Sequence, residues 1–311
     1  MNHRCLRCYG SLNDDEIDFH PTCSRSFFGQ TIPPVLPYGL DTLQELAEQI
    51  VRQRIAVTGV QPKLSLDLER QGTASRLTLV GLWGQYILKP PFGEFPTMPE
   101  NEDLTMHLAT LFGIKTVPHT LIRLQTGELA YLTKRIDRLP NGRKVAMEDF
   151  CQLAERQTAD KYKGSMELVA KIIRRYSSQA PLDLVALYEL TLFCFLTGNA
   201  DMHLKNFSLW RTNGQISLTS AYDLVATKLL LPEDKEELAL TLNGRKNRLK
   251  PDDWLEFAQT LGLTDTQRNS IHRRFQSRFN KAITLIESSF LQERACLSYI
   301  ELMQERQARI G

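Results

Sequence analysis

The chain has 311 residues, of which 42% are hydrophobic and 24% are charged. These fractions are those of a globular protein, so they exclude a disordered, fibrous or collagen-like chain. Lysine and arginine together number 38, and aspartate and glutamate 36, which gives a net charge of +2. A chain so nearly balanced is not a whole-surface nucleic-acid binder, so a charged substrate must be held by a local cluster.

The sequence also predicts a cytoplasmic protein without a membrane partner. No stretch reaches the roughly 18–20 uninterrupted apolar residues of a membrane span, since the longest apolar run, 184–196, contains Tyr188, Glu189 and Thr191. The N-terminus lacks the apolar region of a signal peptide. Six cysteines in this length do not form a disulfide scaffold, so we expect reduced thiols.

The composition shifts near residue 140, from a β-rich first part to a helical second part. After an N-terminal Cys/His segment and linker at 1–37, we expect a small lobe at 38–140 and a larger lobe at 141–311. This order predicts an α+β fold with a small β-rich lobe, a larger helical lobe and a cleft between them.

Periodicity and turn signals define the elements of each lobe. In the small lobe we expect a helix from Asp41, a strand–loop–strand at 55–69, a strand ending at Lys89, a helix from Glu100 to Phe112 and a strand pair at 120–137. In the large lobe we expect helices at 166–176, 181–197, 252–262 and 266–308, and a β-like stretch near 207–219.

Three of the six cysteines fall within the first 23 residues. Cys5, Cys8, His20 and Cys23 form the pattern Cys-x2-Cys-x11-His-x2-Cys. Two close pairs of soft ligands can close a tetrahedral structural Zn²⁺ site. The alternative is that Cys5 and Cys8 pack beneath the main domain and His20 caps a turn. In either case the segment is structural and says little about activity.

The most specific segment is NADMHLKNFSLW, residues 199–210, in which four residues separate Asp201 from Asn206. Kinase-type phosphoryl transfer needs such a pair on one loop, because the aspartate accepts the substrate hydroxyl proton and the asparagine holds a magnesium ion. The spacing alone is weak evidence, and Asn206 could instead form an Asx turn. His203, within the same loop, has the plainer interpretation of a packing side chain.

Three further residues, in the right order, raise the weight of this pair. Asp223 lies 22 residues after Asp201, where a second metal-binding carboxylate is needed. Lys89 can reach ATP phosphates as a point charge, and Glu102 could pair with it. Taken singly, Lys89 could be an ordinary strand-end lysine. Glu102 could serve the helix dipole, and Asp223 could cap the next segment.

The expected phosphate loop, VTGVQPK, contains a single glycine, Gly59. Its backbone amides could still cradle phosphate oxygens, and Lys63 adds a positive charge. The residues expected to contact the phosphates are Val57, Thr58, Gly59, Val60, Gln61 and Lys63.

The ordered motifs GVQPKLSL, YILKPP, PENE, KRIDR, MEDFCQ, NADMHLKNFSLW and YDLV resemble the HipA-like serine/threonine kinase toxins of bacterial toxin–antitoxin modules. The resemblance, from about residue 40 to the end, implies a two-lobed protein-kinase-like fold that uses ATP and Mg²⁺. By position it implies that Asp201 is the catalytic base, that Asn206 and Asp223 are Mg²⁺ ligands, and that Lys89 binds ATP phosphates. It also implies that Lys134, Arg135 and Ile136, before Asp137, form the hinge whose backbone meets adenine. We further expect Asp137, His203 and Lys205 to contact the nucleotide.

The chain departs from the longer HipA proteins in two ways. Its phosphate loop starts near residue 55, so it resembles the short HipT type, which lacks an N-terminal subdomain. That type implies a helix-turn-helix antitoxin, which alone would contact DNA, and a small protein resembling the missing subdomain. The family's autophosphorylated serine is Ala56 here. Either Thr58 substitutes for it or the serine has been replaced.

The resemblance implies transfer of the ATP γ-phosphoryl group to a protein serine, on an aminoacyl-tRNA synthetase of the tryptophanyl type, which would block translation. Two alternatives remain open. The unusual phosphate loop also suits a kinase of small molecules or lipid headgroups. The Cys/His segment and helical scaffold also suit a non-catalytic, zinc-containing binding module.

Overall fold

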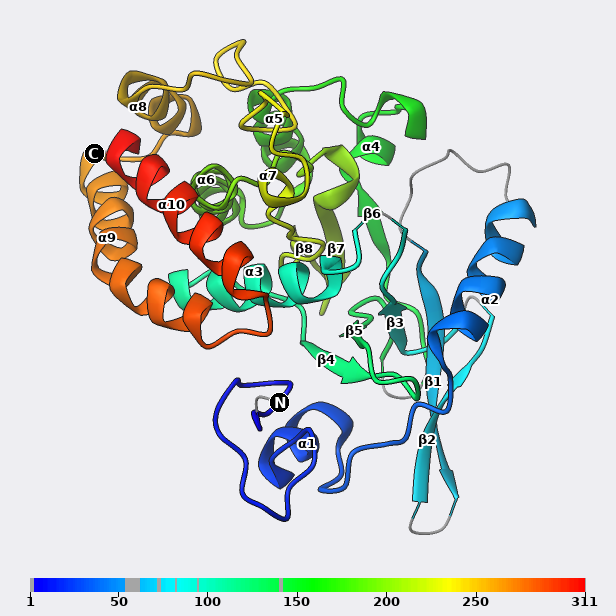
Figure 1. The fold of residues 1–311 in the computed structure, drawn as a ribbon. Coiled ribbons are helices and arrows are strands. Elements are labelled where there is room, and N and C mark those ends of the chain that lie inside the picture. The colour runs from blue at the N-terminus through cyan, green and yellow to red at the C-terminus, as the bar shows by residue number, and fades with distance from the viewer. Residues whose placement is uncertain are drawn as a thin grey trace. The chain divides into compact units, whose positions relative to one another are not determined.

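The computed structural model describes residues 3–53, 62–71, 74–81, 83–93, 95–139 and 142–310. The chain divides into two compact units (Figure 1). We call Met1–Asp103 with Val117–Arg143 the N-terminal unit, and Leu104–Thr116 with Lys144–Gly311 the helical unit. The helix α3 (Met98–Phe112) runs from the first unit into the second.

The N-terminal unit is built on an antiparallel five-stranded sheet in the order β2-β1-β3-β5-β4. Its strands are β1 (Leu64–Gln71), β2 (Ala74–Leu79), β3 (Tyr86–Lys89), β4 (His119–Arg123) and β5 (Leu129–Lys134), and its other helices are α1 (Pro21–Phe28) and α2 (Leu40–Gln53). Leu64 and Leu66 alternate into the core, as expected for a half-buried strand. Pro90 follows β3 directly and cannot donate to a sheet ladder.

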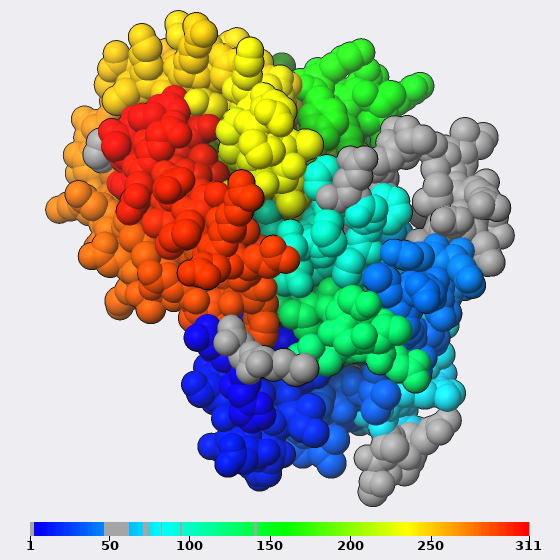
Figure 2. All heavy atoms as spheres, viewed as in Figure 1, coloured from blue at the N-terminus to red at the C-terminus, as the bar shows by residue number. Residues whose placement is uncertain are grey.

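The helical unit surrounds α6 (Ala180–Thr197), whose apolar residues are buried on nearly every side. The other helices and turns are α4 (Phe150–Leu153), η1 (Thr158–Asp160), α5 (Met166–Tyr176), η2 (Leu204–Asn206), α7 (Thr227–Leu230), α8 (Pro251–Leu261), α9 (Asp265–Glu287) and α10 (Glu293–Ile310). A three-stranded antiparallel sheet, β6-β7-β8, accompanies them, from β6 (Met147–Asp149), β7 (Ser208–Thr212) and β8 (Gln215–Leu218). Figure 2 shows α9 and α10, in orange and red, side by side at the surface of this unit.

Helix α6 is long and apolar enough to cross a membrane by length and composition alone. However, 67% of the apolar window is buried inside the protein, which is the burial of a core helix. The helix ends at Gly198, whose φ of 66° favours glycine. A Cβ there would also lie 2.7 Å from a Leu302 methyl carbon and 2.9 Å from the Lys228 Cβ, so these side chains would have to shift to accept another residue.

Most expected elements are present, with two qualifications. The helix expected at 266–308 is interrupted between α9 and α10. The reason is local: the Ser289 hydroxyl accepts a hydrogen bond from the Leu291 amide, in competition with helical bonding. The expected strand and phosphate loop at 55–61 lie outside the described residues.

Candidate active site

Lys89 and Glu102 form a buried ion pair in the N-terminal unit. Lys89 ends β3, Glu102 is in the second turn of α3, and the Lys89 Nζ lies 2.5 Å from the Glu102 Oε1. Their side chains are only 4% and 0% exposed. The Lys89 Nζ also lies over the Tyr131 ring, 5.4 Å from its centroid, where the π-electrons attract a cation. The pairing that the sequence suggested is therefore present.

The residues expected to meet adenine begin at Lys134, the last residue of β5, in the same unit. The Lys134 amide donates to the Pro118 carbonyl and the Arg135 amide to the Gln85 carbonyl, at 2.9 and 2.8 Å. These two N–H groups are thus engaged in the fold. The Asp137 carbonyl is engaged as well, because it accepts a hydrogen bond from the Arg138 guanidinium at 3.0 Å.

Side chains fix the shape of this segment. Arg135 and Arg138 both form ion pairs with Asp137, at 2.8 and 2.6 Å. Burial raises the pKa of Asp137, but the hydrogen bonds and charges of the two arginines outweigh it and hold that pKa below its usual value. Lys134 lies over the Phe27 and Tyr86 rings, and burial lowers its pKa.

Lys63 is described and exposed, immediately before β1. The remaining residues expected in the phosphate loop, Val57, Thr58, Gly59, Val60 and Gln61, lie outside the described residues, as does Ala56. Their contacts with phosphate remain predictions from the sequence.

In the helical unit, the loop after α6 is organised around the backbone of Asp201. The Asp201 amide donates to the Asn199 Oδ1 at 3.0 Å, and the Asp201 carbonyl accepts from the Asn206 Nδ2 at 2.9 Å. The same carbonyl accepts from the His203 amide at 2.8 Å. Because Asn206 uses its nitrogen for this bond, its side-chain oxygen can serve as a metal ligand.

The Asp201 carboxylate accepts a hydrogen bond from the hydroxyl of Tyr162. The Tyr162 ring packs edge-on against His203, with ring centroids 4.9 Å apart. Burial and the neighbouring Asp201 carboxylate raise the pKa of Tyr162 well above its usual value, so this hydroxyl keeps its proton at neutral pH. The sequence did not suggest Tyr162, which lies 39 residues before its partner.

Asp201 and Asp223 are both close enough to His203 to affect its titration. Burial lowers the pKa of His203, while the two carboxylates oppose that effect. The net effect favours the neutral imidazole. Its Nδ1 atom is buried and makes no hydrogen bond within the described part of the chain.

Asp223 follows the β7–β8 hairpin and has a φ of 61°, a left-handed conformation that non-glycine residues rarely adopt. The preceding Tyr222 is anchored: its hydroxyl bonds to the Ser208 hydroxyl at 2.6 Å and donates to the Lys205 carbonyl at 3.1 Å. The loop carrying Lys205 and the segment carrying Asp223 are thus joined through one tyrosine. A carboxylate and an amide oxygen are hard ligands of the kind that Mg²⁺ prefers.

Lys205 forms an ion pair with Asp149 at 2.7 Å. Asp149 also caps α4, where it accepts a hydrogen bond from the Gln152 amide. The Lys205 side chain is 34% exposed, so this pair is far more solvated than Lys89–Glu102. The motif MEDFCQ contained Asp149, but nothing in the sequence indicated its partner.

The structure also brings together the residues of the expected zinc site, Cys5, Cys8, His20 and Cys23. Their ligand atoms all lie within 4.8 Å of one another, in the N-terminal unit. This cluster is separate from the residues considered above.

Comparison with known proteins identifies the family. Residues 55–283 match the model of the HipA-like C-terminal domain. This match covers most of the chain, which therefore belongs to that family.

Relatives agree with this assignment. The chain is 29% identical over 220 residues to "Putative kinase Y4mE" of Sinorhizobium fredii, covering 68% of this chain and 51% of that protein. It is 28% identical over 212 residues to "Serine/threonine-protein kinase toxin HipA" of Shewanella oneidensis, covering 62% of this chain and 47% of that protein. The chain thus spans about half the length of these two relatives.

The fold is likewise similar to a solved structure, that of Shewanella oneidensis HipA in a complex with HipB and its operator DNA. The TM-score is 0.66 at 22% identity, over 85% of this chain and 70% of that one. The predicted α+β, HipA-like kinase fold, with a β-rich first part and a larger helical part, is confirmed.

Proposed function

We propose that the chain is an ATP-dependent serine/threonine protein kinase. The observation that carries this proposal is the buried Lys89–Glu102 pair, on a strand and on the helix that follows it. Kinases use such a pair to hold the lysine that binds ATP phosphates. Burying two charges costs several kcal/mol per ion before they attract each other, so a buried pair is weak evidence of a purely stabilising role.

The residues of the helical unit supply the other roles. Asp201 would accept the proton of the substrate hydroxyl, and Asn206 and Asp223 would hold Mg²⁺. When bound, Mg²⁺ neutralises charge that develops on the phosphoryl oxygens. The hydrogen bond from the Asn206 side-chain nitrogen to the Asp201 backbone carbonyl would fix the position of the metal ligand relative to the base.

The Tyr162–Asp201 contact fits this assignment, because a phenol hydroxyl occupies the place on the carboxylate that a substrate hydroxyl would take. Substrate would have to displace it before reaction. A serine hydroxyl that replaces Tyr162 would meet an acceptor already aligned for an O–H donor.

We further propose a cytoplasmic toxin with an antitoxin partner. Shewanella oneidensis HipA, in its complex with HipB and operator DNA, supports the antitoxin. The proposal extends to a helix-turn-helix antitoxin that alone contacts DNA, a small third protein of the HipT type, and an aminoacyl-tRNA synthetase of the tryptophanyl type as the substrate. These finer assignments are supported only by the motif resemblance.

The test is to incubate the purified chain with γ-labelled ATP, Mg²⁺ and a bacterial lysate. We expect a labelled protein band, with label on serine, that disappears with Asp201→Asn. Label confined to small molecules or lipid would instead support the alternative kinase. No transfer at all, with ATP and Mg²⁺ present, would contradict both and favour a non-catalytic binding module.

A further inference from the structure

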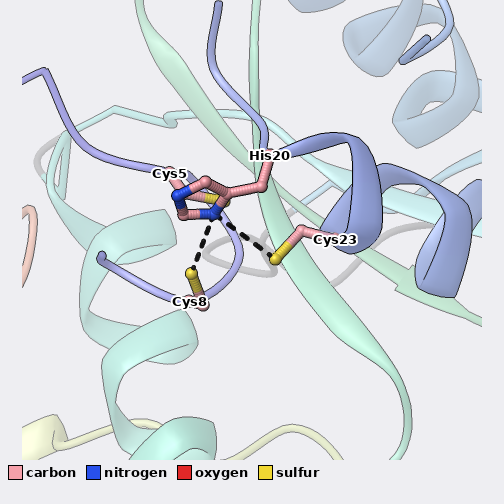
Figure 3. A group of neighbouring side chains, drawn as sticks. All are labelled: Cys5, Cys8, His20 and Cys23. Carbon is pink, nitrogen blue, oxygen red and sulfur yellow. Dashed lines mark hydrogen bonds between the residues drawn. The ribbon is translucent and has the colours of Figure 1, made fainter. Parts of the chain in front are cut away.

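The N-terminal cluster combines two short motifs. Cys5 and Cys8 lie in a turn closed by the Arg4–Ser11 bridge, and His20 and Cys23 lie at the start of α1. Figure 3 shows the three cysteine side chains and the imidazole converging on one point. Their four ligand atoms lie within 4.8 Å of one another, although the residues span 19 positions of sequence.

The turn holds both of its cysteines toward this point. The Cys5 amide donates to the Gly10 carbonyl at 2.8 Å, and the Tyr9 amide donates to the Cys5 carbonyl at 2.9 Å. Tyr9 adopts a φ of 62°, which closes the loop tightly. A Cβ on Gly10 would lie 3.4 Å from both the Cys8 Sγ and the His20 ring, so the turn packs closely around the cluster.

The imidazole is fixed in the tautomer that a metal requires. The His20 Nε2 lies 2.9 Å from the Ser11 carbonyl, which can only accept, so Nε2 carries the hydrogen and Nδ1 presents a lone pair. That lone pair faces two sulfurs, Cys8 Sγ at 3.4 Å and Cys23 Sγ at 3.7 Å. A carbonyl on the outer nitrogen is the usual support of a metal-bound histidine.

We propose that Cys5, Cys8, His20 and Cys23 bind one Zn²⁺ ion as a structural site. Three sulfurs and an imidazole nitrogen make a closed tetrahedral set, and soft thiolates select zinc over the hard cation of the kinase centre. Each cysteine binds as a thiolate and releases its proton to solvent. Cys8 is exposed, so the ion can enter from solvent.

The proposed ion would organise an N-terminal segment that contacts the sheet and α3. The Leu6 carbonyl accepts from the Leu121 amide at 3.3 Å, which covers the edge strand β4. Arg7 donates to the His119 carbonyl at 2.8 Å. The Tyr9 hydroxyl donates to the Asp103 Oδ2 at 2.7 Å, next in sequence to Glu102. We infer that the turn carrying Cys5, Cys8 and Tyr9, which we call the zinc turn, braces the helix carrying Glu102.

The proposal does not depend on kinase activity, and its test uses the full chain. After purification without chelator, elemental analysis should find about one zinc ion per chain. Replacement by Co²⁺ should give the intense visible absorption of tetrahedral cobalt bound by thiolates. Cys8→Ser should lose most of the metal. Cys151→Ser, whose thiol lies in the helical unit, should retain it and serves as the matched control.

Circular dichroism and thermal unfolding of both variants separate loss of a ligand from loss of the fold. Chelation of wild type should lower its unfolding temperature, whereas the same treatment should leave Cys8→Ser unchanged. The proposal is overturned if wild type binds neither zinc nor cobalt after reduction and reconstitution, or if folded Cys8→Ser holds as much metal as Cys151→Ser. Recovery of a disulfide among these cysteines under reducing conditions would overturn it as well.

Discussion

The two units hold the side chains to which we assign ATP binding and catalysis by different means. In the N-terminal unit, Lys89 is fixed by a nearly inaccessible carboxylate, with side chains 4% and 0% exposed. In the helical unit, Asp201 is fixed through its backbone, by Asn199, His203 and Asn206. The first arrangement relies on side-chain charge, whereas the second relies mainly on backbone hydrogen bonds, to which the Asp201 carboxylate adds one contact with Tyr162.

This difference bears on what mutations reveal. Removing one member of a buried ion pair leaves the other charge buried and unpaired, so stability and ligand binding are lost together. Removing the Asp201 carboxylate leaves the backbone bonds in place. Loss of activity at Asp201 is therefore the cleaner evidence of chemistry, and loss at Lys89 needs a stability control.

The largest expected effect comes from Lys89→Ala. Glu102 would remain buried without its cation, so the free energy of unfolding should fall by about 3–5 kcal/mol in urea denaturation. The double variant Lys89→Met with Glu102→Leu removes both charges and should recover most of this loss. If the double variant is as unstable as Lys89→Ala, the unpaired charge of Glu102 is not the cause of the lost stability.

A smaller effect is expected from Tyr9→Phe, which removes the hydrogen bond to Asp103 and leaves the ring in place. Asp103 is buried and also bonds to the His119 Nδ1 at 2.8 Å. Loss of one bond to a buried charged group should cost about 1.5–3 kcal/mol in the same urea measurement. Tyr176→Phe, in the helical unit, is the control. Equal stability of Tyr9→Phe and wild type would break the proposed link between the zinc turn and α3.

Glu100, in the first turn of α3, should make stability depend on pH. Burial raises its pKa to about 7, above the ordinary value of 4.5. The folded state therefore binds more protons than the unfolded state between these values, and its stability should fall as the pH rises from 4.5 to 7. At pH 8 the free energy of unfolding of Glu100→Gln should exceed that of wild type by about 2–3 kcal/mol, and at pH 5 by less than about 1 kcal/mol. A constant difference across this range would contradict the raised pKa.

The smallest effect is expected from Lys205→Met, which breaks the Lys205–Asp149 pair. Its lysine is 34% exposed, so solvent screens the attraction and the loss of stability should be below about 1 kcal/mol. Comparing the loss of stability in Lys205→Met with that in Lys89→Ala shows how strongly burial changes the contribution of a lysine–carboxylate pair. Similar losses in the two variants would show that burial is not the deciding factor.

The sequence was most informative where function depends on spacing along the chain. The helix at 166–176 was predicted and is α5, and the Lys89–Glu102 and Cys/His groupings came from order and ligand type. Residue order, spacing and ligand type can be recognised without knowledge of the tertiary structure.

Contacts between distant segments were not predictable. Tyr162 reaches Asp201, and Asp149 reaches Lys205 across 56 residues, without any local pattern. The Lys134 and Arg135 amides donate hydrogen bonds to Pro118 and Gln85, which are distant in sequence. The break between α9 and α10 depends on a serine hydroxyl that competes with the helical backbone.

The most direct test of the central claim is calorimetric titration of the full chain with ATP in Mg²⁺. Wild type and Asp201→Asn should bind ATP with similar affinity, because the carboxamide preserves the loop and removes only the base. The double variant Lys89→Met with Glu102→Leu, once shown to be folded, should bind ATP at least tenfold more weakly. An absence of binding by folded wild type, or equal binding by the double variant, would contradict the assignment of Lys89 and its partner to ATP.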